Sequence, residues 1–307
     1  MRAPPRLKRG DRVALVAPSS PLAAAEPVEA IAAAVERLGF SVQIGDSCRG
    51  ETACGYAAAP AAVKAADINA FFADPAIRAI WCVRGGSTAW QVLPLLDYGR
   101  ICRCPKAFLG FSDVTALHTA IRQRCGFITY HSPTANRALA WEEGDFSWKS
   151  LRAALEMEGC LPVENPPGEP IRRLRPGRAR GELTGGNLSL IAASMGTPWQ
   201  LDARGRILFL EDVGEDVYAV HRMLSQLRFA GVLDRAAGLV FGPFAACRNT
   251  YRADYGVEEL LRDFFAAYPK PVLGNVASAH VTPMVTLPLG AMCTVDGDCG
   301  TMMLEQF

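Results

Sequence analysis

Ser112 has the setting that a nucleophilic serine requires. The stretch Ala107–His118 (AFLGFSDVTALH) begins with apolar residues typical of a buried strand, turns at Gly110-Phe111-Ser112, and opens a helix at Asp113. A serine at such a corner holds its hydroxyl clear of the fold, beside unpaired N–H groups at the helix start. Serine followed by aspartate is also an ordinary helix N-cap. On this stretch alone the N-cap interpretation is favoured.

A nucleophilic serine needs a general base, and the chain offers four histidines. His118 lies six residues beyond Ser112 on the same expected helix, about 9 Å along its axis and on the wrong face. His221 falls in the middle of a helix beside its apolar face, which suits a structural or surface role. His280 follows a strand in a loop of small residues that leaves its imidazole free to face a cleft. It is preferred, by a small margin, to His131, which also follows a strand.

The acid that would orient such a base is expected at Glu211 or Asp212. Both follow the apolar run Arg206–Leu210 (RILFL), at what would be the carboxyl end of a strand. An ionisable group there needs a partner, because burying a lone carboxylate is costly. Alternate residues of a strand face opposite sides, so only one of the two can face a cleft. Glu211 is the first polar residue after the run, and Asp212 is its rival.

A turn at Arg84-Gly85-Gly86 offers exposed N–H groups and close approach of the backbone, as an oxyanion hole or an anion-binding nest would. Taken by itself, a lone Gly-Gly pair favours a plain turn. The chain has no GxGxxG and no Walker motif, which weakens any nucleotide-binding interpretation. We therefore expect no cofactor.

These candidates need parallel strands to bring them to one edge of a sheet. In the first half, strands are expected at residues 12–17, 40–44, 78–83, 107–109 and 127–130, with helices at 24–38, 61–72, 88–96 and 113–123. Each expected strand is apolar throughout, which indicates a sheet covered on both faces. The predicted class is α/β, with a parallel-sheet (Rossmann- or flavodoxin-like) N-terminal domain. Catalytic groups in such sheets lie at the carboxyl ends of the strands.

The second half is expected to form a smaller α/β domain. Its expected strands are 206–210, 238–241 and 272–276, its helices 188–195, 217–229 and 257–267, and residues 284–304 suggest short antiparallel strands. Between the halves, residues 165–180 (NPPGEPIRRLRPGRAR) are rich in Pro, Gly and Arg without apolar periodicity. We interpret them as a linker between a nucleophile domain, 1–164, and a C-terminal domain, 181–307. An anion site on these arginines is less favoured, because no aromatic residues interleave.

Composition excludes several other classes of function. The 307 residues are 50% hydrophobic, which is ample for a globular core, and 32 basic against 31 acidic side chains leave no excess field for nucleic acid or a membrane surface. No segment approaches the roughly 20 apolar residues of a membrane span. The apolar part of the N-terminus, Val13–Ala17, is too short for a signal peptide, so a cytoplasmic location is expected. The ten cysteines are scattered without a CxxC, which predicts structural thiols and no zinc or other metal site.

Segments of the chain resemble, in order, those of one family. They are LKRGDRVALVAPSSP, DPAIRAIWCVRGG with VLPLLDY, LGFSDVTALH, ELTGGNLSLIAASMGTPW, LFLEDVGEDVYAVHRMLSQLR and AHVTPMVTLPLG. The sequence with these segments resembles the LD-carboxypeptidase family of serine peptidases (murein tetrapeptide carboxypeptidases). The resemblance implies a two-domain fold with Ser112 as nucleophile, Glu211 as acid and His280 as base. It also implies an oxyanion hole from the backbone N–H groups of Gly86 and Asp113.

The implied activity is hydrolysis of the L,D peptide bond that holds the terminal D-alanine of murein tetrapeptide, in cytoplasmic cell-wall recycling. An exopeptidase must hold the terminal carboxylate, for which Arg84 is the candidate, with a structural ion pair as its alternative role. The family also suggests a homodimer. Ser87-Thr88-Ala89 replaces the family's aromatic residue and further glycine, and residues 131–136 (HSPTAN) depart from its usual His-Gly-Pro. Both departures bear on substrate preference.

Three alternatives stay open on the sequence. Some members of the family resemble immunity peptidases that cleave aminoacyl-nucleotide antibiotics, which requires an aromatic platform for the base. A non-catalytic ligand-binding α/β protein is disfavoured, because all three polar triad positions are present. A generic esterase is the third alternative.

Overall fold

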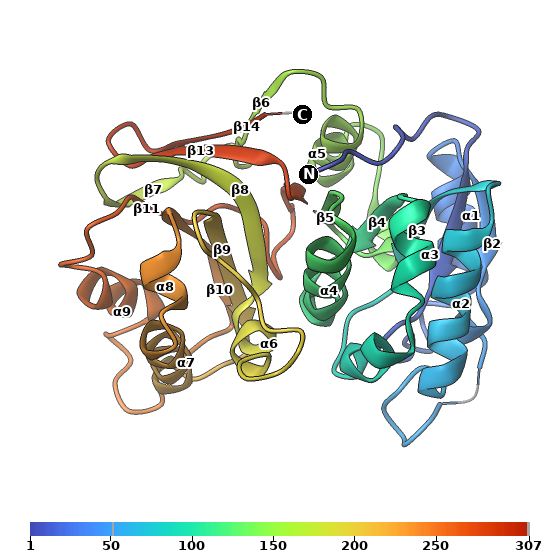
Figure 1. The fold of residues 1–307 in the computed structure, drawn as a ribbon, viewed down its shortest axis with the longest axis horizontal. Coiled ribbons are helices and arrows are strands. Elements are labelled where there is room, and N and C mark those ends of the chain that lie inside the picture. The colour runs from blue at the N-terminus through green and yellow to red at the C-terminus, as the bar shows by residue number, and fades with distance from the viewer. Residues whose placement is uncertain (51, 306–307) are drawn as a thin grey trace. The chain divides into compact units, whose positions relative to one another are not determined.

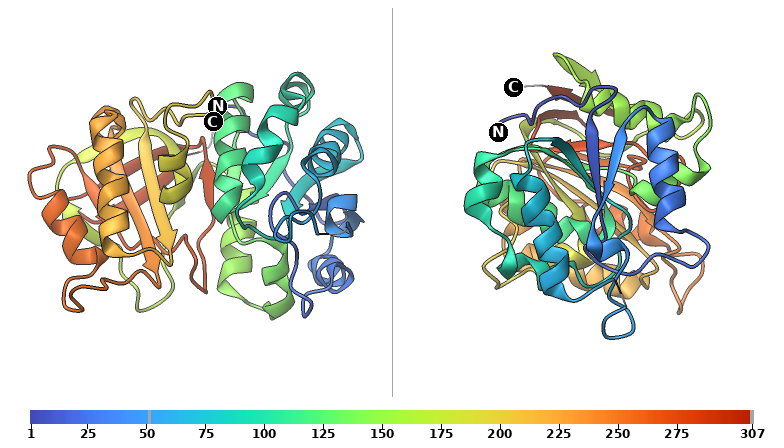
Figure 2. Two further views of the ribbon diagram at one scale, coloured as in Figure 1. Left: turned by 90° about the horizontal axis from the view of Figure 1, so that it is seen from below. Right: turned by 90° about the vertical axis from the view of Figure 1, so that its right-hand side faces the viewer.

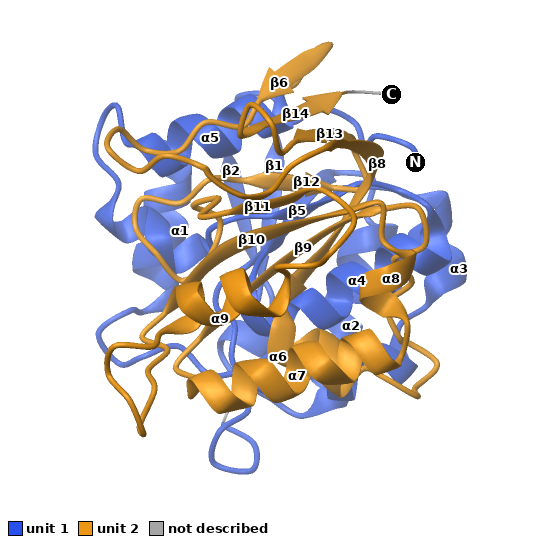
Figure 3. Cartoon of the chain, turned by 90° about the vertical axis from the view of Figure 1, so that its left-hand side faces the viewer, with its two compact units in different colours: residues 1–156 blue, residues 157–307 orange. Residues whose placement is uncertain are grey.

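The chain folds into two compact units, each with its own sheet. A computed structural model describes residues 1–50 and 52–305 and divides the chain into Met1–Glu156 and Met157–Phe307 (Figures 1 and 3). The last two residues of the predicted C-terminal domain, 306–307, lie outside the described residues. The precise limits of the predicted domains, 1–164 and 181–307, remain predictions.

Unit 1 is built on a parallel sheet. Its strands are β1 (Arg12–Val16), β2 (Ser41–Ile44), β3 (Ile77–Cys82), β4 (Ala107–Gly110) and β5 (Thr129–His131). They lie in the order β5-β4-β3-β1-β2, and each neighbouring pair is parallel. The side chains of β4 are all buried, as are all but one of those of β1 and of β3. This continuous burial confirms the predicted sheet covered on both faces.

Helices cover both faces of this sheet. The α-helices are α1 (Val28–Arg37), α2 (Ala61–Ala73), α3 (Tyr98–Arg103), α4 (Thr115–Cys125) and α5 (Phe146–Leu155), and the 3-10 helices are η1 (Asp46–Cys48), η2 (Ala89–Leu95), η3 (Ser112–Val114) and η4 (Ala135–Ala140). Helices α2, α3 and α4 pack together on one face, and α1 packs with η4 on the other (Figure 2). The helix predicted at 88–96 is the 3-10 helix η2, which has a proline inside it.

Unit 2 has a mixed sheet. The strands of this sheet are β6 (Cys160–Pro162), β7 (Arg172–Arg175), β8 (Arg178–Asn187), β9 (Ile207–Val213), β10 (Gly238–Ala245), β11 (Val272–Gly274), β13 (Met292–Asp296) and β14 (Thr301–Glu305), while the short strand β12 (Leu287–Leu289) is not part of it. The sheet runs β6-β14-β13-β8-β9-β10-β11-β7. Strands β8 to β11 are parallel, whereas β7, β13 and β14 each pair antiparallel with their neighbours. The predicted α/β class with antiparallel strands near the C-terminus is confirmed.

The core of unit 2 lies between its parallel strands and the helices α6 (Leu188–Ala193), α7 (Val217–Phe229), α8 (Val232–Arg235) and α9 (Val257–Phe264). The predicted apolar face of α7 is buried there, with Val220 and Leu224 fully buried in the same cluster as Leu208 and Phe241 of the sheet. Removal of this apolar surface from water is the main force that holds the helices to the sheet. The carboxyl ends of β9 and β10 are thereby fixed.

Residues 165–180, expected to form a linker, contain β7 and the start of β8. Strand β7 (RRLR) sits at the edge of the unit 2 sheet beside β11. Its first two arginines are exposed, and none of its side chains is fully buried. An edge strand has half of its backbone unpaired and does not need an apolar face. The missing apolar periodicity is therefore explained by its place at the edge.

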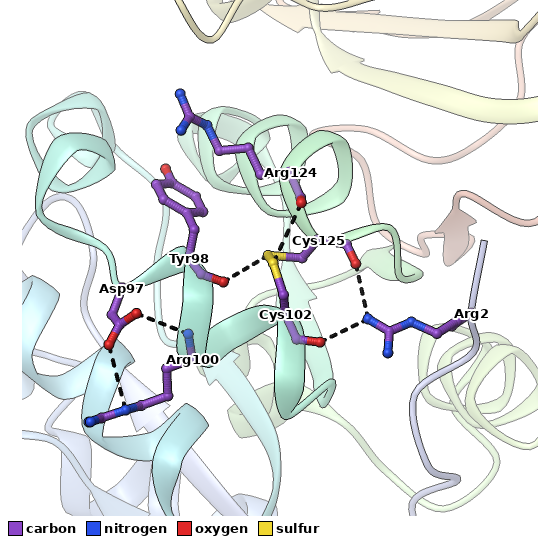
Figure 4. The surroundings of a disulfide bond; sticks show 7 residues. All are labelled: Arg2, Asp97, Tyr98, Arg100, Cys102, Arg124 and Cys125. Atoms are coloured by element: carbon purple, nitrogen blue, oxygen red, sulfur yellow. Dashed lines mark hydrogen bonds and ion pairs between the residues drawn. A yellow bond between two sulfur atoms is a disulfide. The ribbon is translucent and has the colours of Figure 1, made fainter.

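One pair of cysteines corrects the prediction that all ten are thiols. Cys102, on α3, forms a disulfide with Cys125, the last residue of α4 (Figure 4). The Arg2 guanidinium donates to the carbonyl oxygens of both cysteines, at 2.8 and 3.1 Å. Packing of α3 against α4 brings the two together across 23 residues, which no local spacing could indicate.

Candidate active site

Ser112 adopts a backbone conformation that few L-residues tolerate. It follows β4 directly after Phe111 and has φ +64°, in the left-handed region. Such a conformation costs on the order of 1–3 kcal/mol and clusters at functional sites. The strand-to-helix corner predicted at this serine is therefore sharper than the sequence indicates. It has the form of a nucleophile elbow without the GxSxG sequence.

The structure does not place Ser112 at a helix cap. The cap residues of η3 and α4 are Phe111 and Val114, and neither makes a side-chain capping hydrogen bond. The helix predicted to open at Asp113 begins as the 3-10 helix η3 and continues as α4 from Thr115. Within the described part of the chain, the N–H groups of Gly86 and Asp113 donate no hydrogen bond. Both are available to a ligand.

The Gly85-Gly86 turn packs closely against three serines of unit 1, which are Ser19, Ser20 and Ser112. A Cβ at Gly85 would lie 2.9 Å from the Cβ of Ser112 and 3.0 Å from its Oγ. Gly86 has φ +146°, and a Cβ there would lie 2.1 Å from the Oγ of Ser20 and 2.6 Å from that of Ser19. Glycine is required at both positions, at Gly85 by space and at Gly86 by space and conformation. The plain-turn interpretation does not account for this approach to Ser112.

The remaining histidines of unit 1 are buried. His118 lies on α4, and its Nε2 is 2.8 Å from the carbonyl oxygen of Gly110. Burial lowers its pKa to about 4, so the ring is neutral and Nε2–H donates to that carbonyl. His131, at the end of β5, is fully buried and packs edge-to-face with Phe111. His118 therefore has a structural role as a buried neutral ring bonded to the Gly110 carbonyl.

Unit 2 brings two of the predicted residues together. Nδ1 of His280 lies 2.9 Å from Oε2 of Glu211. Glu211 is completely buried near the end of β9, whereas the side chain of His280 is 17% exposed. Bonding Nδ1 to the carboxylate fixes the tautomer and leaves Nε2 as the nitrogen for proton transfer. This geometry suits an acid that orients a base.

Burial raises the pKa of Glu211, and the hydrogen bond to His280 opposes that shift. The carboxylate is thus kept away from water at a cost in free energy. A buried carboxylate with one dedicated imidazole partner is typical of catalytic sites.

Asp212 has a different task. Its carboxylate accepts hydrogen bonds from Asn187 Nδ2 at 2.9 Å, and from the N–H and the hydroxyl of Ser189 at 2.9 and 2.7 Å. These bonds tie the end of β9 to the first turn of α6. Neighbouring residues of β9 thus point to opposite sides, as predicted, with Glu211 toward His280 and Asp212 toward α6.

The other predicted residues lie at the surface. His221 is exposed on α7 and packs edge-to-face with Phe264. Arg84 is exposed, and its Nη1 donates to the carbonyl oxygen of Pro21 at 3.3 Å. Among residues 1–50 and 52–305, no group of three His, Cys, Asp or Glu side chains could hold a metal ion. No helix in those ranges is long and apolar enough to cross a membrane.

Sequence reasoning missed a residue that holds the segment before His280. The side chain of Asn165 donates to the carbonyl oxygen of Asn275 and accepts from the N–H of Ala277 at 2.9 Å. Asn275, with φ +58°, donates in turn to the carbonyl oxygen of Pro170 at 3.0 Å. An asparagine in a Pro- and Gly-rich segment gives no sequence signal for such a distant contact.

The fold and these residues define a class of α/β protein with two sheet-bearing units. A strained serine follows a parallel strand of the first unit, and in the second a buried glutamate near the end of a parallel strand bonds a histidine. Residues 13–132 match the family profile of the LD-carboxypeptidase N-terminal domain, and residues 180–295 match that of the LD-carboxypeptidase C-terminal domain. The chain therefore belongs to the LD-carboxypeptidase family, as its motifs predict.

Individual relatives match almost end to end. A Bacillus subtilis protein named as a probable murein peptide carboxypeptidase is 32% identical, over 98% of this chain and 94% of its own length. The murein tetrapeptide carboxypeptidase of Pseudomonas aeruginosa is 31% identical, over 94% of each chain. Among solved structures, the microcin C7 self-immunity protein MccF has a TM-score of 0.91 at 24% identity, covering 100% of this chain and 99% of its own. MccF has also been solved in complex with aspartyl sulfamoyl adenosine.

Proposed function

We propose that this protein is a serine carboxypeptidase that hydrolyses an L,D peptide bond and releases the terminal D-alanine of murein tetrapeptide. The observation that carries the proposal is the left-handed backbone of Ser112 (φ +64°) at the end of a parallel strand. Strain of this kind persists only where the surrounding structure maintains it. The family and the murein carboxypeptidases among the relatives support the choice of reaction.

In the proposed mechanism, Ser112, Glu211 and His280 act as a triad. Nε2 of His280 takes the hydroxyl proton of Ser112 while Oγ forms a bond to the scissile carbonyl carbon. Glu211 stabilises the resulting imidazolium through its bond to Nδ1. The C–N bond then breaks, and His280 gives its proton to the amine of the leaving D-alanine. A water molecule, deprotonated by His280, then attacks the acyl-enzyme. The ester bond to Oγ breaks, the shortened peptide leaves as a carboxylate, and His280 returns the proton to Oγ of Ser112.

The developing negative charge needs donors that are already in place. We assign this role to the N–H groups of Gly86 and Asp113, which have no other acceptor within residues 1–50 and 52–305. Removing one donor from such a hole in other enzymes costs about 10²- to 10³-fold in kcat. Arg84, exposed beside the turn, is the proposed partner of the substrate's terminal carboxylate. Replacing it with methionine is expected to raise KM more than it lowers kcat.

The first experiment compares L-Ala-D-Glu-Dap-D-Ala with its all-L counterpart, following release of alanine. Wild-type protein is expected to cleave only the peptide with the terminal D-residue. Ser112→Ala is expected to abolish turnover, whereas Ser147→Ala, at a buried serine of α5, is expected to keep it. Cleavage of the all-L peptide alone would rule out the L,D assignment. Full turnover by Ser112→Ala would rule out the mechanism.

A second candidate is hydrolysis of aminoacyl-nucleotide antibiotics, as in self-immunity. It is favoured by an exposed aromatic pair on unit 2, in which Tyr218 and Tyr251 are 53% and 86% exposed and meet edge-to-face. Tyr218 opens the helix that follows β9, the strand that carries Glu211. Such rings offer a nucleobase a stacking surface. Cleavage of aspartyl sulfamoyl adenosine in preference to the murein tetrapeptide would favour this candidate.

The remaining parts of the proposal concern the setting of the enzyme. Recycling of murein peptides places it in the cytoplasm, and the family suggests a homodimer. Fractionation of the native cells and sedimentation of the purified chain test these two points. Recovery outside the cytoplasm or as a monomer would contradict the corresponding one.

A further inference from the structure

The carboxylate of Asp113 is buried and bonded, although its backbone N–H was the part expected to matter. Asp113 is completely buried beside Ser112. Its Oδ2 accepts a hydrogen bond from the N–H of Ala89 at 2.7 Å and another from the hydroxyl of Ser19. Its Oδ1 is buried without a partner in the described structure. The residue after the serine is thus tied to the segment that follows the Gly85-Gly86 turn.

Further hydrogen bonds hold Thr88, which lies in the segment that follows the Gly85-Gly86 turn. The N–H of Thr88 donates to Oγ of Ser19 at 3.1 Å. The Lys64 ammonium donates to Oγ1 of Thr88 at 2.9 Å and to its carbonyl oxygen at 3.3 Å. The side chain of Lys64 is completely buried although it comes from α2. Ser19, Lys64, Thr88, Ala89 and Asp113 thus form one connected group, called below the Asp113 network.

The network holds the turn from several directions. The N–H of Ser20 donates to the carbonyl oxygen of Gly85 at 3.2 Å. Together with the bonds to Thr88 and Ala89, this fixes both ends of the 85–89 turn. Gly86 lies between these anchored positions, directly against Ser19 and Ser20. A turn held at both ends has little freedom to move its N–H groups.

The burial of charge distinguishes this network from ordinary packing. The ammonium of Lys64 and the carboxylate of Asp113 each lose hydration on burial, and buried charges rarely stabilise a fold more than apolar residues of similar volume would. Burial lowers the pKa of Lys64, and the charge of Asp113 opposes that shift. The bonds of the network join loops next to Ser112 and serve no pairing of the sheet. Their common effect is on the position of the turn.

We propose that Lys64 and the Asp113 carboxylate are positioning residues, which hold the 85–89 turn so that the oxyanion hole is preformed beside Ser112. The inference rests on the proposed serine mechanism. Neither side chain touches the reacting atoms in this scheme. They act through the N–H group of Gly86, whose distance to the developing oxyanion they set. Preorganised donors of this kind stabilise a transition state without reorganisation during the reaction.

The test uses Lys64→Met, which removes the charge and keeps the length of the side chain, and a matched pair at Thr88. Thr88→Val removes the hydroxyl that accepts from Lys64, whereas Thr88→Ser keeps it. Lys64→Met and Thr88→Val are expected to lower kcat on the D-alanyl tetrapeptide about 10- to 100-fold, somewhat less than outright loss of a donor. KM is expected to change less than about threefold, because these substitutions leave the contacts that bind substrate and transition state equally unchanged. Thr88→Ser is expected to restore nearly wild-type kcat.

Hydrogen–deuterium exchange of residues 85–89 supplies a readout that does not depend on activity. Faster exchange confined to this segment in Lys64→Met and Thr88→Val, with unchanged exchange in β3 and β4, is the expected result. Unchanged kcat with unchanged exchange would overturn the inference. Faster exchange across the whole of unit 1, with kcat and KM both impaired, would also overturn it, because the network would then be structural only. A wild-type protein inactive on the tetrapeptide would count against the proposed function, and the exchange result would still decide the positioning.

Discussion

Gly85 and Ser112 approach so closely that no side chain fits between them. They are 27 positions apart, on the loops that follow β3 and β4, and a Cβ at Gly85 would lie 2.9 Å from that of Ser112. Because β3 and β4 are adjacent and parallel, their carboxyl ends bring the two loops together. The glycine turn and the serine corner, each weak as a sequence signal, are thus parts of one arrangement in unit 1.

Gly85→Ala is expected to lower kcat by about 10²-fold, because the new methyl group displaces the Ser112 side chain, and misplacement by about 1 Å has such effects. Gly99→Ala is the matched control. It lies in α3, where the nearest atom to a new Cβ is 3.4 Å away, and alanine favours a helix. Steady-state kinetics should show loss of kcat in the first variant and none in the second. Wild-type kcat in Gly85→Ala would contradict the proposed role of the turn.

Local patterns predicted most of the scaffold. Apolar runs such as 107–109 marked parallel strands that are buried as expected, and the apolar positions of 217–229 marked the buried face of α7. The alternation of side chains along β9 was enough to predict that Glu211 and Asp212 would face opposite sides of the strand. Periodicity succeeds wherever burial itself decides the structure.

What the sequence did not reveal depends on contacts between distant segments. The Cys102–Cys125 disulfide and the Asn165 bonds join residues that only the fold brings together. Strand β7 has no apolar face to detect, because it lies at an edge. The positive φ of Ser112 is a tertiary effect as well, since serine has no preference for it. The candidate residues could therefore be predicted from their residue types and positions. The backbone strain at Ser112 and the long-range contacts that hold these residues could not.

Because His118 is buried in its neutral form, we expect the unfolding free energy of the protein to fall in acid. Its pKa is about 4 in the folded protein against an ordinary value of 6.5, so its contribution to stability is full above pH 6.5 and is lost as the pH falls toward 4. The 2.5-unit difference corresponds to about 3 kcal/mol of unfolding free energy. Urea unfolding at pH 7, 5.5 and 4 measures it. His118→Gln, which keeps a donor for the Gly110 carbonyl but does not titrate, should lose less stability over this range. Equal losses in both proteins would contradict the assignment.

The disulfide between α3 and α4 predicts a stability that depends on redox conditions. A cross-link spanning 23 residues stabilises a protein by about 3 kcal/mol, because it limits the conformational freedom of the unfolded chain. Cys102→Ser is expected to lose about that amount, and wild-type protein with reductant should match it. Cys104→Ser, at a free cysteine two positions away, is the control and should keep the sensitivity to reductant. An unfolding free energy unaffected by reductant would show that these cysteines act as thiols, as first expected from the sequence.

A substitution of Glu211 is expected to change the unfolding free energy and the catalytic rate in opposite directions. Burial raises its folded-state pKa above the ordinary value of 4.5, so the stability it contributes is full below pH 4.5 and is lost as the pH rises through the raised value. Glu211→Gln cannot ionise, and its amide oxygen can still accept from Nδ1 of His280. The unfolding free energy of this variant, relative to wild type, should therefore rise from pH 4 to pH 8.

Activity should move in the opposite direction. A neutral amide cannot stabilise an imidazolium as a carboxylate does. Because its NH2 group can also donate to Nδ1, it no longer fixes one tautomer of His280, so kcat of Glu211→Gln should fall by about 10³- to 10⁴-fold, as comparable triad changes do. Chemical unfolding and kinetics on the same samples across that pH range test both halves. A variant that loses stability relative to wild type as the pH rises would show that the ionised carboxylate stabilises the fold. A variant that gains stability and loses turnover would show that this buried charge is maintained for His280, at the expense of stability.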